Sequence, residues 1–357
     1  MKAAFVLPIA GILLLPVSKA NAADSIIVAE PEPIEYLQVC DVFGDGYFFI
    51  PGSLTCLRFS GHMRYDIGFG DALGRDASGI DVNGDGDTSW RKRARLQFRS
   101  DIRTMTEFGV LRAFSEVRTQ YDVDTNEPTR QGLTEVILRE GFIEFAGFRI
   151  GKSVSFFRSF AGNAGQVITH DIIRFGSENV NLFAYTHDFD NGLSATLSLE
   201  DNMDGSIAGD FEAQPYIPNI ASGLRYDGDD FALTFIGGYD SAAEQGAFKA
   251  RLDARLGRFA SFAMAAVSTD GNFENFYANW NGDWALWGGL ATPITEKISY
   301  ANQLSYDESS TFAFVNDIKL ELVPGLQITG EIAYTRNFDN DGDTDQWGGL
   351  VRFQRQF

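Results

Sequence analysis

The stretch Leu57-Arg58-Phe59-Ser60-Gly61-His62-Met63-Arg64-Tyr65-Asp66-Ile67-Gly68-Phe69 decides how this chain folds. Every odd position holds an apolar residue or glycine, and the even positions up to Asp66 hold polar or charged residues. Because successive side chains of a β-strand point to opposite faces, this alternation predicts a strand with one apolar and one polar face.

The same alternation recurs along the rest of the chain. It is clear in residues 193–199, 248–256 and 326–332, where every second position is apolar or glycine. Short links such as Asp190-Asn191-Gly192, which suit tight hairpin turns, alternate with mostly longer links. We count sixteen strands, the last of them ending at Phe357, and find no sign of a second domain.

A lipid-facing barrel explains this pattern better than a soluble sheet, which remains the less favoured alternative. In such a barrel the apolar face points outward and the polar face lines the lumen. An even number of antiparallel strands closes the sheet and leaves no unpaired edge in the bilayer. We therefore predict an all-β fold, namely a 16-stranded antiparallel transmembrane β-barrel with short periplasmic turns, long extracellular loops and a third loop folded into the lumen.

The N-terminus predicts export. Residues 1–22 read as a signal peptide, with Lys2, an apolar run over residues 5–17 and the cleavage sequence Ala20-Asn21-Ala22. The apolar run is shorter than the roughly 20 residues of a spanning helix. Residues 23–56 form a lead-in segment and residues 57–357 form the barrel. We expect a multi-pass β-barrel in the outer membrane of a Gram-negative cell.

Cys40 and Cys56 are the only cysteines of the chain. In an oxidising exported compartment, an even pair at this spacing favours a disulfide, and two free buried thiols are the alternative.

The charge of the chain is strongly acidic, but its basic residues are not scattered. The sequence has 29 Lys and Arg against 49 Asp and Glu, a formal charge of −20 that becomes −22 once the signal peptide with its two lysines is removed. Such a chain is a poor candidate for binding nucleic acid. The basic residues cluster on the polar face of the predicted strands, and we expect the following to line the pore: Arg58, Arg64, Arg91, Arg93, Arg95, Arg99, Arg103, Arg112, Arg118, Lys249, Arg251 and Arg255.

Sixteen strands enclose an aqueous channel, so the pattern predicts passive diffusion of small hydrophilic solutes and ions. The segment 152–180 mixes phenylalanine with alanine and glycine, which suits packing against a wall, and we expect it to narrow the lumen. Its charged candidates for the constriction are Arg158, Asp171, Arg174 and Glu178. A solvated, salt-bridged arginine wall with little selectivity is the alternative interpretation of the basic face.

The sequence offers little support for enzymatic chemistry. His62, His170 and His187 have no nucleophile or metal partner at a recognisable spacing, so we expect no catalytic residue, cofactor or metal. Residues 81–87 and 337–345 have a calcium-like spacing, but Lys92 and Gly348 stand where a closing glutamate is needed. Hydrated acidic loops are the favoured interpretation there.

Several stretches resemble the alphaproteobacterial porin family, the general-diffusion porins of rhizobial-type bacteria. They are residues 31–36, 40–58, 216–218, 223–226, 282–289, 322–325 and 347–357. The resemblance implies a homotrimer with an inward third loop, assembled by the barrel-assembly machinery through the C-terminal Phe357. It also implies contact with lipopolysaccharide and outer-membrane lipid, and passage of small solutes and ions. A solute-specific channel and a structural or adhesion barrel are the alternative functions, and the sign of ion selectivity is left open.

Overall fold

The computed structural model describes residues 38–70, 91–123, 132–201, 217–271, 275–337 and 345–357. The predicted signal peptide, the calcium-like residues 81–87 and most of the second calcium-like loop lie outside these ranges. Within them, no helix is long and apolar enough to cross a membrane.

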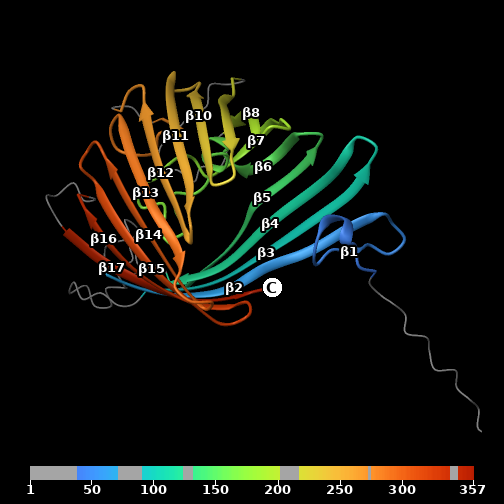
Figure 1. Cartoon of the computed structure of the whole chain (residues 1–357), viewed down its shortest axis with the longest axis horizontal. Coiled ribbons are helices and arrows are strands. Elements are labelled where there is room, and N and C mark those ends of the chain that lie inside the picture. The colour runs from blue at the N-terminus through green and yellow to red at the C-terminus, as the bar shows by residue number, and fades with distance from the viewer. Residues whose placement is uncertain (1–37, 71–90, 124–131, 202–216, 272–274, 338–344) are drawn as a thin grey trace, which may run out of the picture. The chain divides into compact units, whose positions relative to one another are not determined.

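The chain is built almost entirely of strands (Figure 1). A short 3-10 helix, η1 (Asp41–Phe43), and a two-residue strand, β1 (Phe48–Phe49), precede the main sheet. The strands that follow are β2 (Thr55–Gly70), β3 (Arg91–Thr106), β4 (Gly109–Val123), β5 (Gly132–Phe145), β6 (Phe148–Val154), β7 (Asn179–Asp188), β8 (Leu193–Asp201), β9 (Asn219–Asp227), β10 (Phe231–Asp240), β11 (Gln245–Leu256), β12 (Phe259–Ser268), β13 (Trp284–Pro293), β14 (Ile298–Asp307), β15 (Phe312–Val323), β16 (Leu326–Arg336) and β17 (Asp345–Gln356).

The sheet closes on itself. Each strand from β2 to β17 pairs antiparallel with the next, and β17 returns to pair with β2, with Arg352 opposite Asp66. The predicted closed barrel of 16 antiparallel strands is therefore confirmed. Closure satisfies the backbone donors and acceptors of both edge strands, as a bilayer requires.

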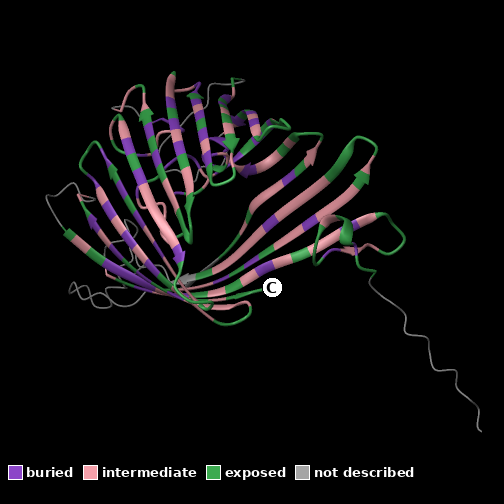
Figure 2. Ribbon diagram, in the orientation of Figure 1, coloured by how far each residue is buried: buried purple, intermediate pink, exposed green. Residues whose placement is uncertain are grey.

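Side-chain burial is inverted relative to a soluble protein. Along β2, the apolar Phe59, Met63 and Tyr65 are exposed on the outer face, whereas Asp66 is buried on the inner one. The alternation of exposed and buried bands runs along many strands in Figure 2. The apolar outer face meets hydrocarbon, and the polar inner face needs partners of its own.

Short turns join the strands at one rim, and the other rim carries mostly longer connections. The turn between β5 and β6 shows how a tight turn is made, since Ala146 and Gly147 both have positive φ, of 50° and 86°. That conformation fits the twist of the flanking strands.

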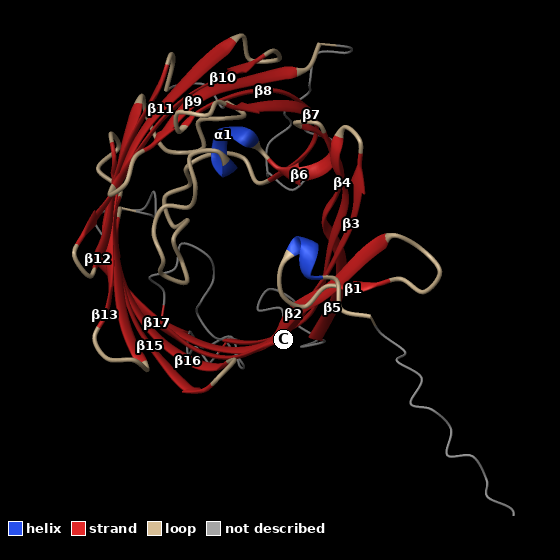
Figure 3. Cartoon of the chain, turned by 45° about the vertical axis from the view of Figure 1, so that its right-hand side comes forward, coloured by secondary structure: helices blue, strands red, loops and turns tan. Residues whose placement is uncertain are grey.

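The third long connection, residues 155–178 between β6 and β7, folds into the barrel. It begins with the short helix α1 (Phe156–Ser159) and lies inside the ring of strands in Figure 3. Phe157 and Phe175 of this connection form a buried cluster with Tyr277 and with Trp287 of β13. The predicted inward loop is confirmed, and the largest apolar core lies between this loop and the inner wall.

The lead-in segment is closed by the predicted disulfide between Cys40 and Cys56, which is confirmed. Tyr47 is buried inside this closed loop, and its ring lies 4.6 Å from the guanidinium carbon of Arg58 and 5.4 Å from that of Arg103. The disulfide loop therefore packs against Arg58 of β2 and Arg103 of β3 on the inner face of the barrel.

Candidate functional site

The basic wall extends across β2, β3 and β4. In the strand register Arg58 is opposite Asp101, Arg64 is opposite Arg95, and Arg103 is opposite Arg112. The same parity places the following predicted residues on the inner face: Arg58, Arg64, Arg93, Arg95, Arg99, Arg103, Arg112 and Arg118. The backbone of Arg91 belongs to β3, but its side chain lies outside the described part of the structure.

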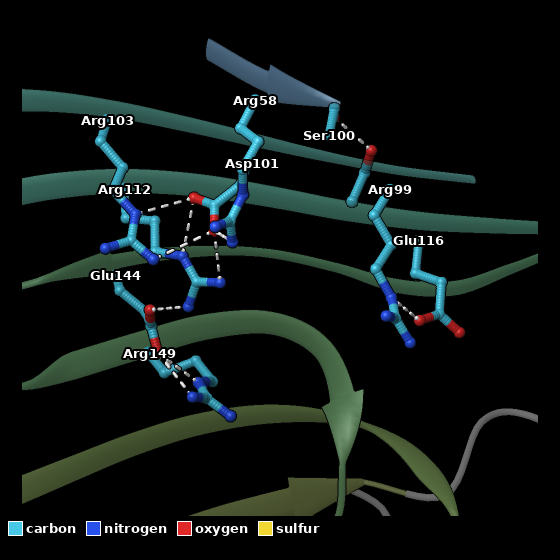
Figure 4. Close-up of polar contacts among 10 residues, drawn as sticks. Arg58, Arg99, Ser100, Asp101, Arg103, Arg112, Glu116, Glu144 and Arg149 are labelled. Carbon is cyan, nitrogen blue, oxygen red and sulfur yellow. Dashed lines mark hydrogen bonds and ion pairs between the residues drawn. The ribbon is translucent and has the colours of Figure 1, made fainter. Parts of the chain in front are cut away.

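Asp101 neutralises one end of this wall. It accepts two hydrogen bonds of 3.0 Å from Arg103 and two of 3.0 Å from Arg112, and Arg58 approaches to 3.8 Å. Figure 4 shows these three guanidinium groups turned toward the one carboxylate. Arg112 also donates to Glu144 over 2.6 Å, and Arg149 donates to the same carboxylate over 2.7 Å.

Two further carboxylates hold other arginines. Glu116 accepts from Arg99 over 2.6 Å and from Gln97 over 2.8 Å, and Arg118 lies 3.6 Å away. Asp66 has both of its oxygens bonded to Arg352 at 2.7 and 3.0 Å. The charge-assisted contacts, bidentate at Asp66, hold the guanidinium planes in fixed orientations.

These acids were missing from our predicted site. Asp66, Asp101 and Glu116 occupy positions of the same parity as the arginines, so the alternation alone could have identified them. Arg139 was missed for another reason. A β-bulge interrupts the pairing of β4 with β5. Glu116 pairs with Glu140, but the next residue, Val117, pairs with Leu138. Arg139 is therefore an extra residue in β5 without a partner position on β4. Arg139 then breaks the strict alternation and bonds to the inward loop.

The wall and the inward loop enclose a cavity of about 430 Å³. Its charged lining among the described residues consists of Arg64, Arg93, Arg95, Arg118, Arg139, Arg158, Arg352, Asp66, Asp171 and Glu178. Seven arginines therefore face three carboxylates, an excess of four positive charges in a chain whose formal charge is −20.

Glu178 is the acid that bridges the loop and the wall. It accepts from Arg139 over 3.0 Å, and Arg158 lies 3.6 Å away. Although burial alone raises the pKa of Glu178, the charges of Arg158 and Arg139 bring that pKa below its ordinary value. Burial lowers the pKa of the nearby His170 imidazole, so this ring is neutral at neutral pH. Arg174 is exposed and does not line this cavity.

The structure corrects our expectation for the basic residues of β11. Lys249 is on the inner face but is only 3% exposed, because the inward loop covers it. Its ammonium donates to the main-chain carbonyls of Phe157 and Phe175. Arg251 is likewise buried, and it donates to the carbonyl of Asn163 over 2.5 Å. Both side chains hold the loop and do not face the open lumen.

Arg255, the last predicted residue, lines a different cavity. This space of about 300 Å³ lies beside the turn between β11 and β12, and Arg258 and Lys319 also line it.

Acidic and polar residues secure the loop along its length. Glu200 accepts from the hydroxyl of Ser155 over 2.7 Å and from the backbone N–H of Phe156 over 2.8 Å, at the start of α1. In the middle of the loop, Asp317 accepts from the N–H of Ile168 and Glu331 accepts from the N–H of Thr169, both over 3.0 Å. The loop is therefore fixed to β8, β15 and β16 by hydrogen bonds to acidic side chains.

Comparison with known proteins gives close agreement with this architecture. A family described as the porin subfamily matches residues 24–351. Porin Omp2b of Brucella suis biovar 1 (strain 1330) is 36% identical over 357 residues, which cover 96% of this chain and 96% of the relative. Porin Omp2b of Brucella melitensis biotype 1 is also 36% identical with the same coverage.

Solved structures share the fold at low sequence identity. The outer membrane channel DcaP of Acinetobacter baumannii superposes with a TM-score of 0.61 at 14% identity, over 87% of this chain and 99% of that one. The anion-selective porin from Comamonas acidovorans gives a TM-score of 0.55 at 12% identity, over 85% of this chain and 100% of that one.

Proposed function

The chain belongs to the porin subfamily and forms a water-filled outer-membrane channel for passive diffusion, and we propose that the cavity beside the arginine wall sets its ion selectivity. The observation that carries this proposal is the excess of four positive charges in the charged lining of that cavity. The resulting prediction is a channel that prefers small anions to small cations.

Local charge matters here more than the net charge of the protein. Charges in contact with water are screened over about 8 Å at physiological ionic strength. An ion in the cavity therefore responds mainly to the arginines around it, and much less to acidic residues elsewhere in the chain. A narrow site with low-dielectric walls strengthens this local effect.

We assign three roles to the basic residues of the inner wall. Arg64, Arg93, Arg95 and Arg118 line the constriction, together with Arg158, Asp171 and Glu178 of the loop. Arg58, Arg99, Arg103 and Arg112 form the salt-bridged wall beside it. Lys249 and Arg251 position the loop.

The direct test is the reversal potential of the purified protein in a planar bilayer with a salt gradient. We expect its sign to show a preference for chloride over potassium. Arg118→Gln should reduce that preference, while Arg225→Gln, which removes an arginine paired with Asp227 outside the cavity, should leave it nearly unchanged. A reversal potential of cationic sign in the unaltered protein would overturn the proposal.

Assembly as a homotrimer is part of the proposal, with lipopolysaccharide and outer-membrane lipid around it. The family supports trimeric assembly, and cross-linking of the protein in outer-membrane fractions tests it. A silent barrel in bilayers would instead favour a structural or adhesion role. The family is one of channels, and the absence of enzymatic activity stays a prediction.

Phe357 supports recognition by the barrel-assembly machinery. Its backbone N–H and carbonyl form hydrogen bonds of 3.0 and 2.9 Å with Gly61 of β2, beside the seam that closes the barrel. Its ring remains 56% exposed, so it is accessible to a partner. Removing Phe357 should lower the amount of protein in the outer membrane more than it lowers the conductance of each channel that assembles.

A further inference from the structure

We propose that the constriction holds a binding site for small dianions, of the phosphate or dicarboxylate type, centred on Arg64 and Arg95. This inference rests on the proposed anion preference. It goes beyond that preference because a binding site makes the flow of small dianions saturate as their concentration rises. A channel with only an electrostatic preference would show no saturation.

The first argument is the pairing of two like charges. Arg64 of β2 and Arg95 of β3 are directly opposite each other in the strand register. Opposed positions in an antiparallel pair place their Cβ atoms about 5 Å apart, and like charges there repel. Arg95 is 8% exposed, and the side chain of Arg64 is 13% exposed, so water screens this repulsion poorly.

The second argument is the lack of a dedicated acid. Arg95 donates from two of its nitrogens to a single neutral oxygen, the amide oxygen of Gln120. Arg64 lies 3.4 Å from Asp66, but both oxygens of that carboxylate already accept from Arg352. At the other end of the wall, by contrast, Asp101 and Glu144 form salt bridges with Arg103, Arg112 and Arg149.

The third argument is the number of unused donors. A guanidinium carries five N–H groups, and a buried one that is not bonded costs free energy. Within the described residues, the Nε atoms of Arg64 and Arg118 are buried without a hydrogen-bond partner. Both residues line the same cavity as Arg95.

A small dianion matches this arrangement in charge, shape and size. Planar guanidinium forks bind carboxylate and phosphate oxygens through paired hydrogen bonds. Two charges on one solute would offset two of the four excess positive charges of the lining. The cavity of about 430 Å³ falls in the range of small-molecule sites. Glu178 and Asp171 on the loop side disfavour larger polyanions by repulsion.

The test measures ion current through the purified, reconstituted protein in chloride, with inorganic phosphate or succinate added at a pH of about 8. We expect a concentration-dependent, saturating reduction of the chloride current. Phosphate and succinate acting alike identifies a general dianion site, and a tenfold or larger difference between them assigns the site to one chemistry.

Arg95→Lys is the decisive variant, because it keeps the charge but loses the planar fork. We expect it to raise the half-saturating concentration about tenfold, while the reversal potential stays nearly unchanged. Arg95→Gln should weaken saturation further and also reduce the anion preference. Arg225→Gln, which removes a charge outside the cavity, should change neither readout. Arg64→Lys provides a second, independent fork deletion.

The outcomes separate the two proposals. Anion preference without saturation in the unaltered protein would overturn the dianion site and leave the proposed function standing. Saturation that both lysine variants retain in full would also overturn it, because the fork geometry would then be irrelevant. A cationic reversal potential would overturn the proposed selectivity itself.

Discussion

Lys249 of β11 donates from its buried ammonium to the main-chain carbonyl of Phe157 over 3.0 Å, although the two residues are 92 positions apart in the sequence. The same ammonium donates to the carbonyl of Phe175 and lies 4.1 Å from the centroid of the Phe157 ring. One cation therefore joins the beginning and the end of the inward loop. Since its donors are directed at backbone carbonyls, it holds the path of the loop whatever side chains the loop carries.

Lys249→Met should loosen the inward loop. The substitution leaves two buried carbonyls without their donor, at a cost of roughly 2–3 kcal/mol. We expect a larger and noisier single-channel conductance, together with faster protease cleavage of the loop in the purified protein. Lys297→Met, at an exposed turn position, is the matched control. A conductance equal to that of the unaltered protein would argue against this anchoring role.

The contact of the loop with Asp317 and Glu331 gives a second prediction. These carboxylates are opposite each other on β15 and β16 and are both buried. They accept from the backbone of Ile168 and Thr169, and the Thr169 hydroxyl adds a bond of 2.5 Å to Glu331. Glu331→Ala should release the middle of the loop and raise conductance, whereas Glu321→Ala, near the rim of β15, should not. Equal conductance in both variants would contradict the prediction.

Glu178→Gln should increase the anion preference at neutral pH. The change removes one of three carboxylates from the cavity and leaves its seven arginines in place. A single partly screened charge at this distance is expected to change the anion-to-cation permeability ratio roughly twofold. The measurement is the reversal potential, with Glu308→Gln, outside the cavity, as the control. A lower anion-to-cation permeability ratio in Glu178→Gln than in the unaltered protein would contradict this prediction.

The pH dependence of selectivity follows from the two shifted groups of the loop. The pKa of Glu178 is lowered, so this carboxylate stays charged as the pH falls through its ordinary pKa of about 4.5. The pKa of His170 is lowered by burial, so its ring gains a proton only below its ordinary value of about 6.5. Both groups therefore gain their protons mainly below their ordinary pKa values.

Further acidification should raise the anion preference, because protonation of either group makes the cavity more positive. A titration of the reversal potential measures this directly. His170→Gln should abolish the part of the rise that comes from the imidazole. A steady change centred near pH 6.5 that His170→Gln removes would contradict the lowered pKa.

Removing the disulfide should destabilise the lead-in segment without closing or widening the channel. The bond between Cys40 and Cys56 closes a loop whose stabilising effect is about 3 kcal/mol in the chain-entropy picture. We expect the Cys40→Ser, Cys56→Ser double variant to be cleaved faster by protease near Tyr47 and to unfold at lower temperature. Conductance should be retained, because the disulfide loop lies against Arg58 and Arg103 and not in the cavity.

Much of the fold could be predicted from alternation because that pattern is local. The face on which Arg64 or Phe59 lies follows from the residues beside it in the same strand, and no knowledge of other strands is needed. The inward loop could also be predicted, since its small and apolar residues suit packing. Arg139 shows the limit of this reasoning. A β-bulge there shifts which positions of β5 face the lumen, and no neighbouring residue in the sequence predicts that bulge.

The site depended on partners that lie far away along the chain. Arg352 and Asp66 are 286 positions apart and meet only because β17 closes against β2. Lys249 has the parity of a pore-lining residue, yet a loop from the other half of the barrel covers it. The odd or even position of a residue in its strand predicts which face of the sheet its side chain lies on. It does not predict which other segment covers that side chain.

The sequence by itself determined a sixteen-stranded barrel with a basic inner face, because strand periodicity and turn chemistry are properties of neighbouring residues. Only the tertiary structure decided which of those arginines are neutralised. Asp101 and Glu116 pair with the arginines of one region, while Arg64 and Arg95 meet across two strands without an acid of their own. The physical reason is that a guanidinium's electrostatic environment depends on distances across strands, which closure of the barrel sets.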